Sequence, residues 1–208
     1  DLAVAAVGGG GAARVVAGAK ESQETFRFDG DFTVMVRFQT EQGGTLVAKA
    51  PEKGKWEADA KAFYIRDGRL VYDIGWLGSV SGQANVNDGK EHVAVLVVKD
   101  GKARIVLDGK AEGEKAGMAR PDKKGFVFKV GAAAPDFGGD YAGELGNVRF
   151  WKRALDEGEV KQLSSGKEDA VNTPDYNWAP GGEAGKGKLV ETSFGAVPGY
   201  ATKVKLVA

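Results

Sequence analysis

Three Asp-Gly pairs that separate runs of alternating residues place the strongest constraint on the fold of this chain. They are Asp67-Gly68, Asp100-Gly101 and Asp108-Gly109. Both residue types tolerate the positive φ angles of a tight type I′ turn, so each pair predicts a two-residue β-hairpin. Two of the pairs lie within "NDGKEHVAVLVVKDGKARIVLDGK", residues 87–110, which is therefore expected to form a meander of antiparallel strands.

Period-two alternation predicts further strands elsewhere in the chain. In "FDGDFTVMVRFQT" the large apolar residues from Phe32 to Phe38 share one face, which is typical of a strand with one side in a core. A turn at Gly43-Gly44 is expected to separate this strand from the next one, "GGTLVAKA". The chain has 32 glycines and only 6 prolines, which suits many short strands joined by tight turns. This pattern favours a β-sandwich or barrel.

One short helix is expected near residues 156–165. Asp156 is predicted to be its N-cap, with Glu159 as the capping-box partner three residues later. Leu155 and Val160 are spaced to form a hydrophobic staple, and Gly166 is predicted to end the helix.

The overall composition disfavours some classes of partner. Lys and Arg number 29, as do Asp and Glu, so the formal net charge is zero and nucleic acid is not an expected partner. The absence of cysteine excludes disulfides and thiolate metal sites. No apolar run approaches the roughly 20 residues of a membrane helix, so membrane insertion is not expected either.

The chain is expected to form one domain preceded by a short segment. Residues 1–20 are small and apolar with a "GGGG" break, and they predict either a flexible lead-in or a docking strand such as Ala13–Val16. Residues 21–208 are predicted to be a single domain whose last strands lie within 187–207. The sequence starts without methionine and lacks a signal-peptide pattern, which suggests a mature protein or an excised piece.

Three stretches resemble a known family in both order and spacing. They are "FDGDFTVMVRF", "VNDGKEHVAVLVVKDGKARIVLDGK" and "GELGNVRFWKRALDEGEVKQL", which together span Phe26–Gly166. They are similar to the opening strand, the central hairpin and the closing strand and helix of laminin-G-like (LamG) domains of the concanavalin A-like lectin/glucanase superfamily. The resemblance implies an all-β, antiparallel two-sheet jelly-roll sandwich. The stretch "GRLVYDIGWLGSVSG" resembles a variant found in large multidomain proteins of planctomycete-type bacteria.

The resemblance also bears on His92, which is the only histidine in the chain. It implies that His92 is a scaffold residue at the start of a strand, although Glu91 stands where the family usually has tryptophan. A catalytic histidine needs a nucleophile or metal partner, and the sequence indicates neither.

Glycoside hydrolysis is possible on this fold but is not favoured by the acidic residues. Retaining glycosidases need two carboxyl groups about 5–5.5 Å apart. The related glucanases carry an alternating Glu-x-Asp-x-x-Glu pattern. Its nearest counterpart is "WEADAKA", in which Glu57 and Asp59 are present but Ala62 takes the place of the third acid.

Calcium is the one cofactor that the resemblance implies, and calcium prefers six to eight hard oxygen ligands. Asp29 and Asp31 in "FDGD" are candidates, but Gly146 aligns with the acid that the family carries in its closing strand. Asp136 and Asp140 in "PDFGGDYAGE" form a second candidate group, for which the simpler interpretation is a solvated turn.

Sugar binding requires aromatic faces with nearby polar groups. Trp76 lies in the glycine-flanked stretch "DIGWLGSVSG" and is the leading candidate, unless it fills the core between the sheets. Trp56 is expected at the surface, whereas Trp151 is expected to be a packing residue. The predicted ligand-binding residues are Trp56, Tyr72, Asp73, Trp76, Gln83, Asn85 and Trp178.

These observations lead to a ranked set of functional hypotheses. The first is a non-catalytic module that binds glycans as part of a larger exported protein. The second is a structural domain that binds a neighbouring protein domain, and the third is a glycoside hydrolase. Exposed tryptophans that converge on one groove would favour sugar, whereas a flat apolar patch would favour protein. The resemblance implies an extracytoplasmic location: secreted, periplasmic or at the cell surface of a bacterium.

Overall fold

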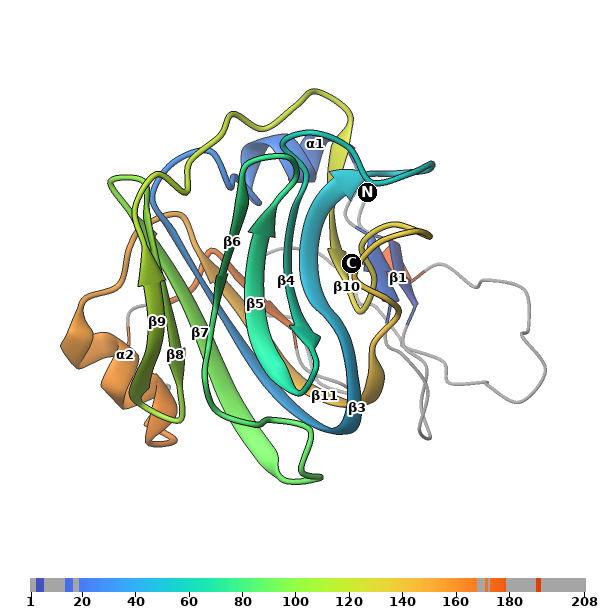
Figure 1. Cartoon of the computed structure of the whole chain (residues 1–208). Coiled ribbons are helices and arrows are strands. Elements are labelled where there is room, and N and C mark those ends of the chain that lie inside the picture. The colour runs from blue at the N-terminus through green and yellow to red at the C-terminus, as the bar shows by residue number, and fades with distance from the viewer. Residues whose placement is uncertain are drawn as a thin grey trace.

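Strand β3 (Phe32–Pro51) is the longest element and connects the two sheets of a β-sandwich (Figure 1). The computed structural model describes residues 3–5, 14–16, 19–167, 171, 173–178 and 190–191. The N-terminal half of β3 pairs with β7 and β11, and its C-terminal half pairs with β4 and β10. The predicted turn at Gly43-Gly44 is wrong, because these residues lie within one continuous strand with φ angles of 138° and 105°.

Sheet A contains the C-terminal half of β3 and seven other strands. In spatial order they are β13 (Val190–Glu191), β1 (Ala3–Ala5), β2 (Arg14–Val16), β10 (Phe126–Val130), β3, β4 (Lys61–Arg66), β5 (Arg69–Ile74) and β6 (Gly78–Ser81). The strands within 21–166 pair antiparallel, and β1 pairs parallel to β13 beyond β2. The rest of the predicted late-strand region, 187–207, lies outside the described residues, and the division of the chain at residue 20 stays a prediction.

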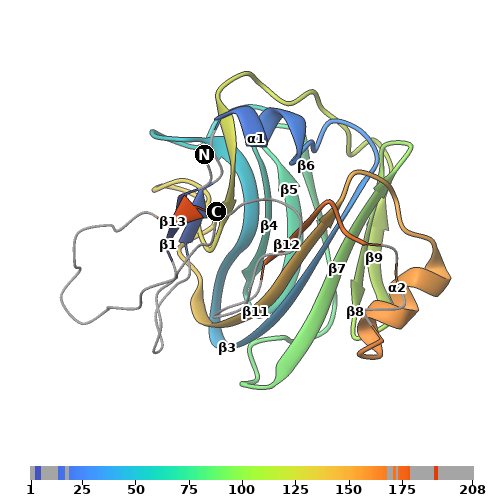
Figure 2. The same ribbon diagram turned by 180° about the vertical axis from the view of Figure 1, so that it is seen from behind.

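Sheet B contains the N-terminal half of β3 and five other strands (Figure 2). In spatial order they are β12 (Tyr176–Trp178), β11 (Ala142–Trp151), β3, β7 (Glu91–Lys99), β8 (Lys102–Leu107) and β9 (Lys110–Lys115). The edge strands β6 and β9 approach each other closely, because a Cβ on Gly113 would lie only 2.5 Å from the Ser81 carbonyl oxygen. The two sheets therefore nearly close on this side, which confirms the predicted jelly-roll sandwich.

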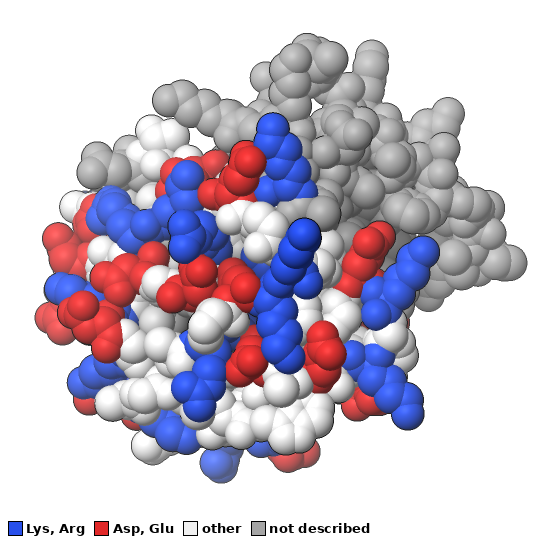
Figure 3. Space-filling view, turned by 90° about the horizontal axis from the view of Figure 1, so that it is seen from above, with Lys and Arg blue, Asp and Glu red and all other residues white. Residues whose placement is uncertain are grey.

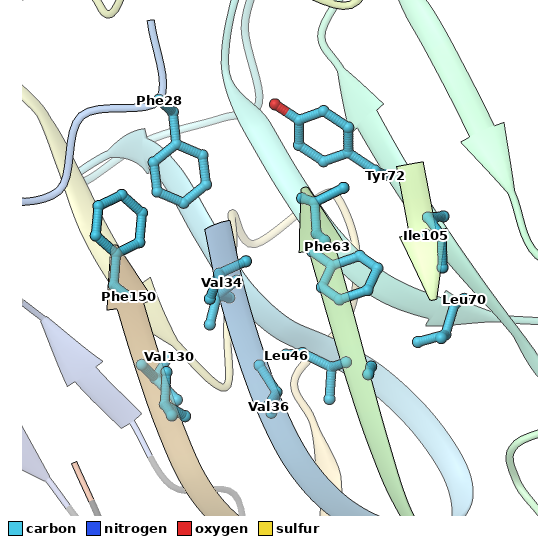
Figure 4. Close-up of a cluster of buried hydrophobic side chains, with 14 of the residues drawn as sticks. Phe28, Val34, Val36, Leu46, Phe63, Leu70, Tyr72, Ile105, Val130 and Phe150 are labelled. Atoms are coloured by element: carbon cyan, nitrogen blue, oxygen red, sulfur yellow. The ribbon is translucent and has the colours of Figure 1, made fainter. Parts of the chain in front are cut away.

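The core lies between the inner faces of the two sheets (Figure 4). Aromatic rings fill one end of it, where the ring centroids of Phe28 and Phe32 are 4.4 Å apart and those of Phe28 and Phe150 are 5.5 Å apart. Aliphatic side chains such as Val36 and Leu46 fill the rest. Because successive side chains point to opposite faces of each strand, these core side chains lie on the same side of it, as the sequence pattern predicts.

All three Asp-Gly pairs form the predicted hairpin turns. Asp67, Asp100 and Asp108 have φ angles of 52°, 48° and 49°, and the glycines that follow them have φ angles of 72°, 71° and 80°. Positive φ at both central residues is the mark of a type I′ turn, whose twist matches that of the flanking strands.

Helix α2 (Glu157–Ser164) begins where the sequence predicts. The Asp156 carboxylate accepts a hydrogen bond from the Glu159 backbone N–H at 2.9 Å, and Glu159 Oε2 accepts one from the Asp156 N–H at 3.0 Å. The C-cap is Ser165, one position before the predicted cap Gly166, which follows it with a φ of 76°. The periodicity gave no sign of the short helix α1 (Ala19–Glu24), which packs near β10.

A buried cluster of charged residues closes the end of the sandwich near α1. Lys49 and Lys61 are fully buried, and their Nζ atoms lie 3.2 and 2.7 Å from the carboxylate of Asp122. Lys49 also donates to the carbonyls of Ser22 and Phe26. The buried carboxylate of Asp122 therefore connects β3 and β4 to the loop before β10. In this part of the interior, paired charges replace apolar packing.

Candidate functional site

The outer face of sheet A carries Asp73, one of the residues predicted to bind a ligand, and the turn with Trp76 follows the same strand. Tyr72 and Ile74 of β5 point into the core, so Val71 and Asp73 face outward. The cross-strand register places Lys129, Ala48, Ala62, Asp73 and Ser79 in one row across five strands. The two alanines in the middle of this row are fully buried, in an apolar cluster that includes Tyr64 and against which Trp56 and Phe137 pack.

Trp76 lies in the turn between β5 and β6, at the upper end of both strands in Figure 1. Its side chain is 74% exposed, which makes it the one large hydrophobic residue that is exposed in the described part of the chain. Its φ is 62°, a backbone conformation that is unfavourable for a bulky residue. The alternative prediction, that Trp76 fills the core, is therefore wrong. The adjacent Leu77 packs partly against the core instead.

The Trp76 turn is held in place by the loop before β4. The Gly75 N–H donates to the Ala60 carbonyl at 2.8 Å, and the Gly75 carbonyl accepts from the Asp59 N–H at 3.0 Å. A Cβ on Gly75 would lie 2.3 Å from the Glu57 carbonyl oxygen, so this close approach requires glycine. Because the N–H and the carbonyl of Gly75 are both bonded to this loop, the next residue, Trp76, is held in its strained conformation at the surface.

Asp73 is the acidic group of the outer face that is nearest to this turn in sequence. It is half-buried, and burial raises the pKa of its carboxyl above the ordinary value, while Arg66 and Lys115 oppose the rise. The Asp73 carboxylate makes no hydrogen bond or ion pair with the residues that the structure describes. Its carboxylate oxygens are therefore available to accept hydrogen bonds from a ligand.

Trp56 also lies at this end but is not free to stack on a ligand with both faces. Its ring is 3.9 Å from that of Phe137 and almost parallel to it, and its side chain is partly buried. Its backbone N–H donates to Asp136 Oδ1 at 2.8 Å. Its Nε1 lies beside Gly75, the residue before Trp76, so both tryptophans are next to the same turn.

The remaining predicted residues are not at this end. Tyr72 is fully buried in the core, so its assignment as a ligand contact is wrong. Gln83 and Asn85 are exposed but follow β6 toward the opposite end of β5, where Asn85 Oδ1 lies against Gly68. The backbone of Trp178 pairs with Val148, while its side chain lies outside the described residues.

Two arginines that sequence reasoning missed lie next to Asn85. Arg66 and Arg69 flank the Asp67-Gly68 turn and face each other across the hairpin. They line a pocket of about 300 Å³ together with Asp67, Val71 and Ser81. A two-residue turn always places its flanking residues opposite each other, so the "RDGR" pattern contained the signal for this pair.

His92 has the scaffold role that the family resemblance implied. Its Nδ1 lies 2.8 Å from Asp108 Oδ2 and its Nε2 lies 3.1 Å from Asp88 Oδ1. Asp108 Oδ1 also accepts the Val93 N–H at 2.8 Å. The histidine therefore joins the loop before β7 to the turn after β8, a role that concerns local architecture.

The acids considered for glycoside hydrolysis do not lie on a strand. Glu57 and Asp59 belong to the loop before β4, and Asp59 has a φ of 68°. Asp59 lies 3.6 Å from Arg120 and 3.8 Å from Lys123. The strand geometry that would bring two alternating carboxylates to one face is therefore missing at these residues.

The carboxylates considered for calcium already have partners. Asp29 forms an ion pair with Arg27 at 3.1 Å, and Asp31 accepts the Asp100 N–H at 2.8 Å. The side chain of Arg37 lies about where a side chain on Gly146 would project, with contacts of 3.1 Å to a Cβ placed there. Asp136 bonds to Trp56, and Asp140 also has a partner. Within the described ranges no group of three or more His, Asp or Glu side chains is arranged to hold a metal ion, and calcium binding stays a prediction.

Charges of both signs are mixed over the end of the sandwich where α1 and the Trp76 turn lie (Figure 3). Lys and Arg alternate there with Asp and Glu and do not separate into a basic stripe, which agrees with the zero net charge. None of the helices in the described part is both long and apolar enough to cross a membrane.

Comparisons with known proteins agree with this architecture. The family model described as "Concanavalin A-like lectin/glucanases superfamily" matches residues 9–161 of the 208. A heptameric SAP-like pentraxin from Limulus polyphemus is similar in structure, with a TM-score of 0.51, 16% identity and coverage of 69% of this chain and 72% of the pentraxin chain. No curated protein sequence matches the chain.

Two sialidases are also similar in structure. A Trypanosoma rangeli sialidase gives a TM-score of 0.59 at 15% identity, over 83% of this chain and 30% of the sialidase chain. The NanB sialidase from Streptococcus pneumoniae gives 0.52 at 17% identity, over 64% and 23% of the two chains. At such identities the likeness shows the fold alone, and this chain spans less than a third of either sialidase.

Proposed function

The chain belongs to the concanavalin A-like lectin/glucanase superfamily, and from this premise we propose that it is a non-catalytic module that binds carbohydrate through the outer face of sheet A. Trp76 is the stacking residue, and Asp73 accepts hydrogen bonds from sugar hydroxyls. Sugar rings present an apolar face to an aromatic ring and hydroxyls at the rim, which is the chemistry that this pair supplies.

The exposure of Trp76 is the observation that carries the proposal. A tryptophan that is 74% exposed gains little from burial, and a φ of 62° makes its conformation costly. Stability therefore does not account for this residue at this turn. A ligand that covers the indole would account for both its exposure and its fixed position.

A protein partner is the second candidate, because exposed tryptophans are also frequent contact residues in protein interfaces. The polar surroundings favour sugar: Asp73 and Ser79 lie on the same outer face, and Trp76 is not part of a wide apolar patch in the described structure. Glycoside hydrolysis has weaker support, because Glu57 and Asp59 lie in a loop.

We further propose that the module is part of a larger exported bacterial protein, of the planctomycete-type variant that "GRLVYDIGWLGSVSG" resembles. The extracytoplasmic location rests on the same family resemblance. Calcium enters only as a condition of the binding experiment, since the carboxylates considered for it have other partners.

A glycan array tests the proposal directly. The wild-type chain is applied with calcium and again with a chelator, beside Trp76→Ala and the control variant Lys161→Ala, which changes an exposed residue of α2. We expect specific binding by the wild type and the control, and a loss of about tenfold or more in Trp76→Ala, equivalent to about 1.4 kcal/mol.

Two results would count against the proposal. One is equal binding by Trp76→Ala and wild type, which would move the site elsewhere. The other is a folded protein that binds no glycan in either condition. If binding is lost only when the chelator is present, calcium becomes a candidate cofactor again.

A further inference from the structure

Arg66 and Arg69 form an arrangement that stability does not explain. They are directly opposite each other in the β4–β5 hairpin, and alternation from Tyr64 and Val71 places both on the outer face of sheet A. Like charges directly opposite across two strands are destabilising. Both side chains are exposed.

Neither arginine has a carboxylate partner in the described part of the chain. Arg66 lies over the ring of Tyr64, with its guanidinium carbon 5.7 Å from the ring centroid, and its charge opposes the rise in the pKa of Asp73. The side chain of Arg69 makes no hydrogen bond or ion pair with the residues that the structure describes. Asp67, in the turn between them, is the acidic residue of the pocket but pairs with neither.

The pocket between the two arginines has the size and chemistry of a subsite for one anionic group. Its volume is about 300 Å³, at the lower end of the range for small-ligand sites. Guanidinium groups are planar forks that bind the two oxygens of a carboxylate or sulfate in parallel. Ser81 adds a hydroxyl, and the exposed amides of Gln83 and Asn85 lie on the segment that follows β6.

We propose that Arg66 and Arg69 form an anion subsite that binds a carboxylate or sulfate group of an acidic glycan. The proposal rests on the carbohydrate-binding function proposed above and names its ligand class. The subsite and the Trp76 turn lie at opposite ends of β5 (Figure 1). That separation is about 20 Å at roughly 3.3 Å per residue. The ligand that reaches both is therefore an oligosaccharide or polysaccharide and not a single sugar.

An acidic glycan fits better than nucleic acid, which is also anionic. Nucleic acids need a basic surplus or stripe to neutralise a continuous row of phosphates. This chain has zero net charge, and Asp73 lies on the same face between the arginines and Trp76. One local pair of arginines, with Asp67 in the same pocket, suits a ligand with widely spaced charges.

The first experiment detects the subsite with small probes. Sodium glucuronate, sodium sulfate and uncharged glucose are titrated into the ¹⁵N-labelled full chain, while the Nε–H signals of the arginines and the amide signals are followed by NMR. We expect saturable shifts at Arg66, Arg69 and Ser81 with glucuronate, sulfate or both, and no shifts there with glucose. Equal shifts at exposed lysines over the whole surface would show that these anions bind without a site, and the proposal would fail.

The second experiment measures discrimination between matched glycans. Binding is compared for a neutral polysaccharide, a uronate-bearing one and a sulfated one, using wild type, Arg66→Gln/Arg69→Gln, and Lys161→Gln/Lys167→Gln. The last variant removes two positive charges from α2 and the residues after it. We expect the arginine variant to lose at least about tenfold in affinity for the acidic polymers. Neutral binding and the control variant should be unchanged.

Thermal unfolding shows whether the arginines have only a structural role. The arginine variant should be at least as stable as wild type, because it relieves a like-charge contact. A large fall in its melting temperature would overturn the proposal.

The remaining outcomes separate this proposal from the one on which it rests. Undiminished preference for acidic polymers in the arginine variant refutes the subsite alone. Equal loss of neutral and acidic binding refutes its selectivity for anions. Tighter binding of single-stranded DNA or of a phosphopeptide at these arginines refutes the glycan assignment. If no polysaccharide binds wild type at all, the carbohydrate-binding function fails as well.

Discussion

Substitutions at Trp76 separate the energetic cost of its turn from its function. A tryptophan buries up to about 250 Å² when fully enclosed, and Trp76 is 74% exposed. Its removal gives up about 60 Å² of contact, or at most about 1.5 kcal/mol at about 25 cal/mol per Å². Alanine loses this contact and keeps the left-handed strain, which costs about 1–2 kcal/mol.

Glycine at the same position loses the contact but removes the strain, at a cost of about 0.5–1 kcal/mol in backbone entropy. We therefore expect Trp76→Gly to be more stable than Trp76→Ala by about 0.5–1 kcal/mol. Both variants should lose glycan binding, because both lack the indole. The reversal of the usual order of alanine and glycine is the specific signature of a positive φ.

Urea unfolding of the two variants measures this difference through the midpoint, provided that the slopes agree. The same pair of substitutions at Lys161, in helix α2, is the control, and there alanine should exceed glycine by about 1 kcal/mol. If Trp76→Ala is as stable as Trp76→Gly, the turn is not strained as described. If either variant binds glycans as well as wild type, Trp76 is not the stacking residue.

Three further predictions follow from other parts of the fold. Asp122→Asn should destabilise the chain by about 3–5 kcal/mol in urea unfolding, because it leaves the buried ammonium groups of Lys49 and Lys61 without a counter-charge; unchanged stability would contradict the buried cluster. Tyr72→Phe should raise stability at pH 7 by about 1 kcal/mol by removing a buried hydroxyl without a hydrogen-bond partner in the described structure. Burial also raises the pKa of Tyr72 above its ordinary value. Below about pH 10 the tyrosine is neutral in the folded and the unfolded chain, but at higher pH the unfolded chain ionises first, so the free energy of unfolding falls as the pH rises further. The wild type should therefore lose stability more steeply than Tyr72→Phe above pH 10, and equal slopes would contradict this. Asp156→Ala should destabilise the chain by about 1 kcal/mol through loss of the helix cap. An unchanged melting temperature in thermal unfolding followed by circular dichroism would contradict this.

Features that depend on a few consecutive residues were predictable from the sequence. The φ angles at the three hairpin pairs, Asp67-Gly68, Asp100-Gly101 and Asp108-Gly109, agree with the type I′ turns predicted from the residue types alone. The capping box of α2 depends only on Asp156 and Glu159, so it too was legible in the sequence. In both cases the interacting residues are no more than three positions apart in the sequence.

The bend at Gly43-Gly44 shows where local reasoning failed. A glycine pair after an alternating strand is a reasonable turn signal. In the folded chain β3 continues through it, because β4 and β11, which are distant in sequence, supply backbone partners on either side of the bend. Those partners are not visible in any local window.

The candidate site shows the same division. The sequence alone determined the hairpins, the sandwich class and the presence of Trp76 in a glycine-flanked turn, because these depend on local turn chemistry and alternation. Alternation also placed Tyr72 and Asp73 on opposite faces, but only the second sheet decided which of them is buried. Tertiary packing likewise separated Asn85 from Trp76 by the length of β5 and left Arg66 and Arg69 without a carboxylate in the described structure. Burial and charge pairing are sums over neighbours from distant parts of the chain, and only the folded structure specifies those neighbours.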